Sequence, residues 1–149
     1  MHRILFFPLV ALLGAMMLLA QEQKVKAKDV PAPVVAAAAK AFPKATVKGW
    51  SKEVEDGKTQ YEASMTEGAV KRDVIFAADG KLVLVEEAIA TAALPPAVSQ
   101  AVKAKYPQGV IQLAEKLIKD GEVQYEVHLK KAAKKEMLLT AAGKIVKEE

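Results

Sequence analysis

The stretch Asp56-Gly57-Lys58-Thr59-Gln60-Tyr61-Glu62 decides the fold, because it returns 64 residues later as Asp120-Gly121-Glu122-Val123-Gln124-Tyr125-Glu126. Five of the seven positions are identical. Asp-Gly suits a tight hairpin turn, since glycine accepts a positive φ and aspartate tolerates it. The residues after each turn alternate in polarity, which is typical of a strand with one buried face. Each copy therefore predicts a hairpin whose second strand buries its tyrosine.

The repeated stretch lies within a longer internal duplication. Residues 30–63 and 94–127 share ten identities in 34 positions when they are aligned at the 64-residue spacing. Beyond the second strand of each copy the spacing becomes 63 residues. A constant spacing with a single step is the signature of a repeat. We interpret the chain as one combined domain that contains two units, repeat 1 over residues 30–93 and repeat 2 over residues 94–149.

Each repeat predicts one helix followed by four strands. Proline opens each helix, where the first turn tolerates it, and Pro43 and Pro107 end the two helices. Apolar residues recur at helical spacing and give each helix one core face. Short turns between the strands require antiparallel pairing. The predicted strands cover residues 46–54, 59–66, 71–77 and 82–87 in repeat 1, and residues 110–118, 123–130, 134–140 and 144–147 in repeat 2.

The expected fold class is therefore α+β. It is a tandem repeat of helix plus four-stranded antiparallel meander, with the helices on one face of the sheet. One helix covers only one face of its sheet, so the other face stays open to solvent or to a partner. We expect eight strands in one curved sheet, and two separate small sheets are the alternative.

The N-terminus has the pattern of a secretory signal peptide. A basic start, His2-Arg3, precedes an apolar run that ends at Ala20 and is followed by polar residues, which is the order found in such signals. We assign the signal to residues 1–20, with cleavage between Ala20 and Gln21. Residues 21–29 are polar and rich in lysine, and we expect them to form a flexible lead-in.

Two alternatives remain open for this segment. Cleavage after Ala27 is the alternative position for signal removal. The rival to a removed signal is an uncleaved membrane anchor, although the run is at the short limit for spanning a bilayer and contains Pro8.

Charge and composition narrow the classes of partner. The formal net charge is +4 at pH 7, and a mildly basic exported protein favours anionic partners such as membrane surfaces or acidic proteins. Nucleic acid is not an expected partner at that location. The chain has no cysteine, which excludes disulfides, thiol chemistry and a lipoprotein anchor. The fold must therefore rely on its apolar core.

Several motifs carry a family resemblance. They are Leu94-Pro95-x-x-Val98-x-x-Ala101…Tyr106-Pro107, Asp120-Gly121-x-x-x-Tyr125-Glu126-Val127 and Ala141-Ala142-Gly143-Lys144, with Asp56-Gly57…Tyr61-Glu62 and Phe76-Ala77-Ala78-Asp79-Gly80-Lys81 in repeat 1. Together they resemble the PepSY-like family, which is also described as similar to beta-lactamase-inhibitor proteins. The resemblance covers nearly all of the mature chain. It implies an envelope or extracellular protein with tandem helix-plus-sheet repeats and a noncatalytic binding or inhibitory role, for example toward peptidases or other cell-wall enzymes.

The chain also departs from that family. Many members carry an aromatic residue just after the last Asp-Gly turn, where this chain has Leu82 and Ile145. The beta-lactamase inhibitors carry cysteines, and this chain has none. Inhibition of a beta-lactamase in particular is therefore not supported.

No set of residues predicts a catalytic centre, a cofactor or a metal site. His128 is the only histidine after the signal and lies beside Glu126 and Lys130, and we interpret it as a surface residue, because zinc sites need several histidine or cysteine ligands. The serines have no basic partner at a spacing that predicts a triad. We interpret Glu86-Glu87 and Asp73 as a solvated edge, since a calcium loop supplies several oxygen ligands within one turn.

The candidate partner contacts lie on two surfaces. In the predicted first strand Trp50 has the opposite parity to Val47, which places it on the open side, where tryptophan is a common binding anchor. A bulge is the alternative, because it would exchange the two faces. A group of lysines at the hairpin of repeat 2 predicts a contact with an anionic partner or with lipid headgroups, or serves only to solubilise the loop. The full set is Trp50, Gln60, Glu62, Gln124, Glu126, Lys130, Lys131, Lys134 and Lys135.

The resulting hypothesis is a noncatalytic, periplasmic or secreted binding module. It binds or inhibits an envelope or extracellular protein such as a peptidase, and it contacts the membrane only through the signal segment if that segment is uncleaved. The alternative is a small-ligand or lipid-binding envelope protein, which should have a cavity between its sheet and its helices.

Overall fold

The computed structural model describes residues 22–55 and 57–149, so the expected signal and its cleavage position, Ala20 and Gln21, lie outside the described residues. The described residues form nine strands, two α-helices and two short 3₁₀ helices. The helices are η1 (Ala27–Asp29), α2 (Ala32–Ala41), η2 (Thr91–Ala93) and α3 (Pro96–Lys105). The strands are β1 (Gln23–Val25), β2 (Thr46–Glu55), β3 (Lys58–Glu67), β4 (Val70–Ala77), β5 (Leu82–Ile89), β6 (Val110–Lys119), β7 (Glu122–Lys130), β8 (Glu136–Thr140) and β9 (Ile145–Glu148).

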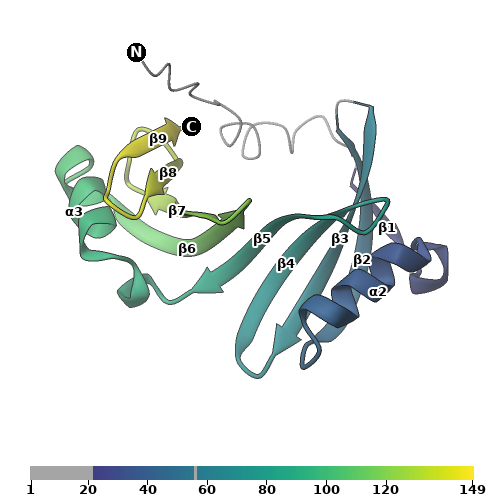
Figure 1. The fold of residues 1–149 in the computed structure, drawn as a ribbon. Coiled ribbons are helices and arrows are strands. Elements are labelled where there is room, and N and C mark those ends of the chain that lie inside the picture. Colours follow the sequence, from purple (N-terminus) through teal and green to yellow (C-terminus); the bar gives the residue numbers. More distant parts are fainter. Residues whose placement is uncertain (1–21, 56) are drawn as a thin grey trace, which may run out of the picture.

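The nine strands form one antiparallel sheet in which spatial order equals chain order, from β1 to β9 (Figure 1). Helix α2 precedes β2–β5 in the chain, and α3 precedes β6–β9. Pairing of β5 with β6 joins the two halves, with Val85 opposite Ile118 and Ile89 opposite Ala114. The expected α+β class and antiparallel pairing are confirmed, and the alternative of two separate sheets is wrong.

Strand β1 was not among the eight expected strands, and it comes from the segment that we expected to be a flexible lead-in. Gln23–Val25 pairs with Trp50, Ser51 and Lys52 of β2, and Val25 packs against the core beneath α2. An unpaired strand edge offers a row of free N–H and C=O groups to any neighbouring segment. Backbone pairing therefore orders this segment, although its composition is polar.

Helices α2 and α3 follow the predicted pattern. Each begins directly after a proline and ends two residues before another one, so the predicted helix ends at Pro43 and Pro107 are confirmed. Val34 and Ala38 of α2 and Val98 and Val102 of α3 are buried. Burial of a valine side chain contributes about 1.5 kcal/mol or more.

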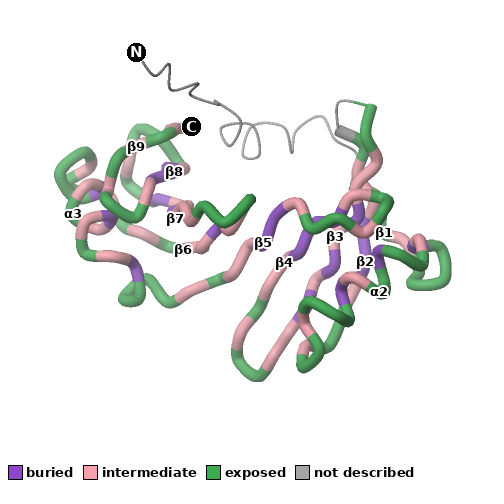
Figure 2. Tube along the Cα trace, viewed as in Figure 1, coloured by how far each residue is buried: buried purple, intermediate pink, exposed green. Residues whose placement is uncertain are grey.

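Two apolar clusters attach the helices to the sheet, and Figure 2 shows buried residues along both halves. The cluster under α2 includes Tyr61, Ala63 and Phe76, and the cluster under α3 includes Val127 and Leu139. The pairs that join β5 to β6 place both clusters on the same side of the sheet. We call the opposite side the open face.

A bulge near the start of β2 decides where Trp50 points. The pairing with β3 shifts by one residue between Val47 and Gly49, so that Trp50 lies opposite the core residue Ala63. Trp50 is only 9% exposed and belongs to the cluster under α2. The prediction that Trp50 lies on the open face is wrong, because the extra residue of the bulge reverses the alternation along the strand.

Strand β6 has the same irregularity. Its pairing with β7 shifts between Ile111 and Leu113, so Leu113 and Leu117 face the open side while Ala114 joins the core. Ala114 is thus the small counterpart of Trp50.

The open face contains apolar as well as polar residues. Ile75, Leu84, Leu117 and Leu138 form a third cluster there, and each is at most 5% exposed. These residues come from β4, β5, β6 and β8, which are not all neighbours in the sheet. Twist and curvature of the sheet bring them together, and they form a small apolar floor within this face.

Glycine holds a turn against each helix. Gly80, between β4 and β5, has φ +90°, and a Cβ atom there would lie 2.7 Å from the Pro33 carbonyl oxygen. Gly143, between β8 and β9, has φ +80°, and its Cβ would lie 2.4 Å from the Ala97 oxygen. Any side chain at these positions therefore meets both backbone strain and a steric clash.

Candidate functional site

Carboxylates gather on the open face around the apolar floor. Asp73 of β4 lies directly opposite Glu86 of β5, and Glu115 of β6 lies directly opposite Glu126 of β7. Like charges in directly opposed positions destabilise a sheet, so this arrangement is a cost that the fold tolerates. The carboxylates that alternate onto this face include Glu62, Asp73, Glu86, Glu115, Glu126 and Glu136, and Glu53 and Glu122 share this alternation toward the ends of β2 and β7.

Burial makes two of these carboxylates weak acids. Burial, together with the charges of Glu115 and Glu126, raises the pKa of Glu86 to about 8. Burial and the charge of Asp73 raise the pKa of Glu62 to about 7. Near neutral pH, burial and the neighbouring negative charges therefore disfavour the ionised form of both side chains. A positive group placed on the open face would favour the ionised form.

His128 stands among three glutamates in the second half of the sheet. Its Nε2 atom lies 3.1 Å from Glu126 Oε1 and 3.8 Å from Glu115 Oε2. Its Nδ1 atom lies 3.3 Å from Glu136 Oε1. We call these four residues the histidine cluster. The interpretation of His128 as a simple surface residue is wrong, because its side chain is only 33% exposed and has carboxylates on both sides of the ring.

The histidine cluster has ligand atoms close enough to share one ion. One ligand atom each from Glu115, Glu126 and His128 lies within 4.8 Å of the others. Burial raises the pKa of both glutamates, and the neighbouring imidazole opposes that rise in each case. The cluster therefore concentrates negative charge in a partly desolvated site with one nitrogen ligand.

The other predicted open-face residues lie where alternation placed them. Gln60 and Glu62 of β3 and Gln124 and Glu126 of β7 are half-buried on the open face. The Oε1 atom of Gln124 is enclosed and has no hydrogen-bond partner among the described residues. A buried acceptor without a donor is uncommon and needs an explanation such as a bound group.

Of the predicted lysine contacts, Lys130 shares the alternation of His128 at the end of β7, and the other three lie in the loop beyond it. Lys130, Lys131, Lys134 and Lys135 are all exposed, at the end of β7 and in the loop that leads to β8. They form an accessible positive surface beside the second half. Their role in binding an anionic partner stays a prediction.

Glu115 and Glu136 were not identified from the sequence as members of the histidine cluster. A hairpin that turns at Asp120-Gly121 pairs Glu115 with Glu126 by simple counting, so that signal was available. Glu136 lies opposite His128 across β7 and β8, and the length of the intervening loop conceals this pairing. The interpretation of Asp73 and Glu86 as a solvated edge is also wrong, because β4 and β5 are interior strands of the sheet.

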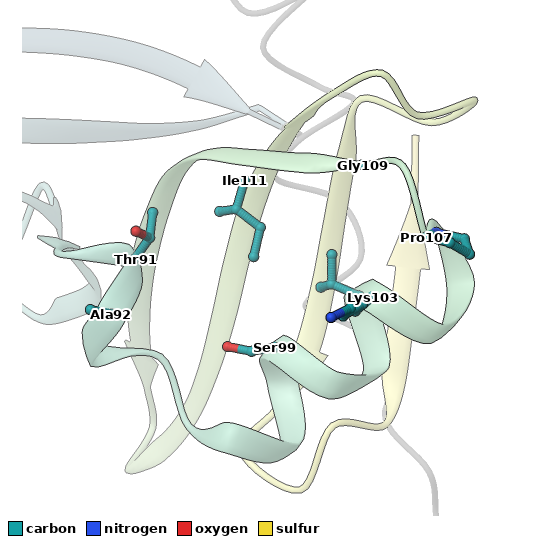
Figure 3. Close-up of a pocket in the computed structure, with 8 residues that line it drawn as sticks. Thr91, Ala92, Ser99, Lys103, Pro107, Gly109 and Ile111 are labelled. Atoms are coloured by element: carbon teal, nitrogen blue, oxygen red, sulfur yellow. The ribbon is translucent and has the colours of Figure 1, made fainter.

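A pocket lies on the other side of the sheet, between α3 and β6 (Figure 3). It has a volume of about 400 Å³ and is lined by residues that include Ser99, Lys103 and Ile111. The corresponding pocket under α2 is smaller, about 280 Å³, and Trp50 lines it. Among the described helices, none is long and apolar enough to cross a membrane.

Comparison with solved structures identifies the fold. A BLIP-like protein from Bacteroides fragilis is 24% identical with a TM-score of 0.66, and the alignment covers 80% of this chain and 85% of that one. A DUF2874 family protein from Bacteroides uniformis is 26% identical with a TM-score of 0.70, over 80% of this chain and 88% of that one. A protein from Bacteroides eggerthii that is described as periplasmic is 21% identical with a TM-score of 0.68, over 80% and 88%.

Sequence comparison identifies the family. No curated protein matches the chain. The sequence profile of a family described as beta-lactamase-inhibitor-like and PepSY-like matches twice, over residues 16–69 and 59–147. The two matches cover most of the chain and both halves of the sheet, which confirms the resemblance found in the motifs. The chain therefore belongs to the PepSY-like family.

Proposed function

We propose that this protein is a noncatalytic, exported binding module whose open face binds a protein segment with basic and apolar side chains. The observation that carries the proposal is the composition of that face, an apolar floor surrounded by carboxylates. A recognition surface of this kind matches an apolar anchor to the floor and cationic groups to the rim.

Charge supports this choice of partner. The whole chain has a net charge of +4, yet each of the neighbouring strands from β3 to β8 places a carboxylate on the open face. The raised pKa values of Glu62 and Glu86 follow from burial and from their acidic neighbours. A cationic partner would favour the ionised form of both groups and would gain binding energy from doing so.

Affinity capture from an envelope extract of the source organism tests the proposal. The wild-type protein is compared with a Glu62→Gln/Glu86→Gln variant and with a Lys131→Gln/Lys134→Gln variant, whose changes lie in the loop between β7 and β8. We expect a protein that wild type and the lysine variant retain, that the glutamate variant loses, and that elutes at high salt because exposed charge pairs are screened. Retention by the glutamate variant with loss from the lysine variant would assign binding to the lysine surface instead.

An inhibitory mode and an envelope location complete the proposal. The family description supports inhibition, for which occlusion of an envelope peptidase by the open face is the expected form.

The basic and apolar N-terminus supports export with cleavage between Ala20 and Gln21, to the periplasm or beyond it, as does the periplasmic description of the Bacteroides eggerthii protein. Mass spectrometry of the exported protein should give an N-terminus at Gln21, whereas an intact Met1 in membranes would establish an anchor.

We also propose that residues 30–93 and 94–149 are two copies of one helix-plus-meander unit. Their equivalent positions pair in the same way, since Ser51 lies opposite Glu62 and Glu115 lies opposite Glu126. The spacing of 64 residues relates both members of these pairs. A binding surface made from both copies would present two related but chemically different halves to one partner.

Small-ligand binding is the second candidate function. The pocket between α3 and β6 has a volume of about 400 Å³, which lies within the range of small-molecule sites, about 300–1,000 Å³. Extraction of the purified protein with organic solvent, followed by mass spectrometry, tests it. A stoichiometric ligand that is lost when Ile111→Trp fills the pocket would support this candidate over protein binding.

A further inference from the structure

We propose that the histidine cluster is a binding site for a divalent transition-metal ion of the Zn²⁺ class. Glu115, Glu126 and His128 Nε2 would supply three ligands, and a solvent molecule or a partner group would complete the coordination. The site lies within the open face, but metal binding does not depend on the proposed partner, because it needs only residues of the second half of that face.

The distances between the ligand atoms fit such an ion. Zinc binds imidazole nitrogen and carboxylate oxygen at about 2.0–2.1 Å, which places tetrahedral ligands about 3.3 Å apart. The Nε2 atom of His128 lies 3.1 Å from one glutamate oxygen and 3.8 Å from the other. Small side-chain rotations are therefore enough to close the three groups around one ion.

The far side of the imidazole has the partner that a metal-bound histidine uses. His128 Nδ1 lies 3.3 Å from the Glu136 carboxylate, so an Nδ1–H directed at Glu136 leaves the Nε2 lone pair facing the other two carboxylates. Metal-ligating histidines almost always donate the other ring N–H to a carboxylate, a carbonyl or water, which fixes the ring and increases its basicity. The geometry thus supplies both the ligand and its support.

Charge gives a second, independent reason for a cation. A neutral imidazole that faces two carboxylates places three electron-rich atoms together, and a proton on Nε2 still leaves three negative charges against one positive charge. Glu115 and Glu126 are directly opposed across β6 and β7, an arrangement that is unfavourable without a counterion. Nearby on the same strand and face, the Oε1 atom of Gln124 also has no partner among the described residues.

The first half of the sheet provides an internal control. The positions equivalent to Glu115 and His128 are occupied there by Ser51 and Ser64. That half has the same backbone pairing around Glu62 but neither the nitrogen ligand nor the opposing carboxylate. Transition-metal binding should therefore be confined to the second half.

Calorimetric titration of the untagged, chelator-stripped mature protein with ZnCl₂ tests the site. We expect one ion per chain, at least tenfold weaker binding in His128→Ser, and at least threefold weaker binding in Glu136→Gln, which removes only the group that orients the ring. The matched control is Glu62→Gln, which removes one open-face carboxylate from the first half and should change the affinity less than twofold. CaCl₂ should not displace the zinc, because Ca²⁺ takes oxygen ligands and does not use imidazole.

The single histidine of the mature chain gives a second measurement. Its first readout uses the wild-type protein alone and therefore needs no variant. The imidazole resonances of His128 should shift on addition of one equivalent of ZnCl₂ at constant pH, and Co²⁺ should give ligand-field absorption that His128→Ser lacks. Unchanged zinc affinity in His128→Ser, displacement by CaCl₂, or His128 resonances that respond to pH but not to zinc would each overturn the proposal. The last result would make His128 a protonated counterion only.

Discussion

The two halves of the open face differ at three of four positions that the sheet pairs identically. The first half has Ser51, Glu62, Ser64 and Asp73, and the second half has Glu115, Glu126, His128 and Glu136. One backbone arrangement thus carries two carboxylates and two hydroxyls in one half, and three carboxylates and an imidazole in the other. The comparison teaches that the framework and the surface chemistry vary independently, because alternate side chains serve the core and the open face.

The core beneath the helices shows the opposite pattern of difference. Trp50 lines the smaller pocket under α2, whereas the larger pocket lies under α3, where Ala114 takes the place of the tryptophan in the core. The second half, which has more ionisable side chains on its open face, therefore also has the larger pocket beneath its helix. Four predictions test this contrast between the halves.

Removal of the tryptophan should have the largest effect. Trp50→Ala gives the first half the residue of the second half, and we expect a loss of about 3–4 kcal/mol in unfolding free energy, because an aromatic side chain is deleted from a packed core. Urea unfolding measures the loss, and Trp50→Phe should recover more than half of it. Unchanged stability together with lost partner binding would restore Trp50 as an exposed anchor.

Substitution of the turn glycines should affect both halves alike. Gly143→Ala places a Cβ atom 2.4 Å from the Ala97 oxygen at a φ of +80°, and we expect a loss of about 2–3 kcal/mol from strain and overpacking. Gly80→Ala should lose a similar amount. Gly121→Ala is the control, since its φ is +82° with nothing within 4 Å, and it should cost about 1 kcal/mol in thermal or urea unfolding. Equal losses at all three positions would show that the helix contact contributes nothing.

The pH dependence of stability should come from the buried carboxylates. The pKa of Glu86 is about 8 in the folded protein because of burial and acidic neighbours, against an ordinary value of 4.5. Between those values the unfolded state loses the proton while the folded state keeps it, so stability falls as pH rises from about 4.5 to 8. Glu86→Gln should flatten the fall and stabilise the protein on the order of 2 kcal/mol above pH 8.

The control for this prediction is Glu122→Gln, which changes an exposed carboxylate in β7. Its pH profile from thermal unfolding should stay parallel to that of the wild type. Parallel profiles for both variants would show that Glu86 titrates normally in the folded protein.

The smallest effect should come from an ion-paired arginine that only the first half has. Arg72 contacts Glu87 at 2.8 Å and Glu67 at 3.0 Å, and its guanidinium lies 5.5 Å from the ring centre of Phe42. Arg72→Met should cost about 1 kcal/mol, since partly exposed pairs contribute little. Its counterpart, Lys135, is exposed, and Lys135→Met should change urea unfolding by less than about 0.5 kcal/mol. A larger loss at Lys135 would reverse the comparison.

Sequence patterns predicted the hairpins and the helices but not which way every strand faces. The Asp-Gly turns and the alternation after them placed Tyr61 and Glu126 correctly, because pairing near a tight turn leaves no freedom of register. The bulge beside Gly49 adds one residue to β2, and it reversed the assignment of Trp50. A glycine inside a strand often marks a bulge, but it does not fix where the extra residue lies. The curvature of the sheet also cannot be predicted from these sequence patterns. It buries Leu138 and Ile75 on a face that strand pairing alone would leave open.

The strictly sequential strand order of the sheet has a consequence for folding. Every strand pairs only with the strand before or after it in the chain, so each strand pairing closes a single connection between chain neighbours. Closing such short loops costs little chain entropy, and topologies of low contact order fold quickly. A chain that leaves a membrane translocon N-terminus first can complete β2–β5 on α2 before α3 emerges, and that finished edge then provides the template on which β6 adds.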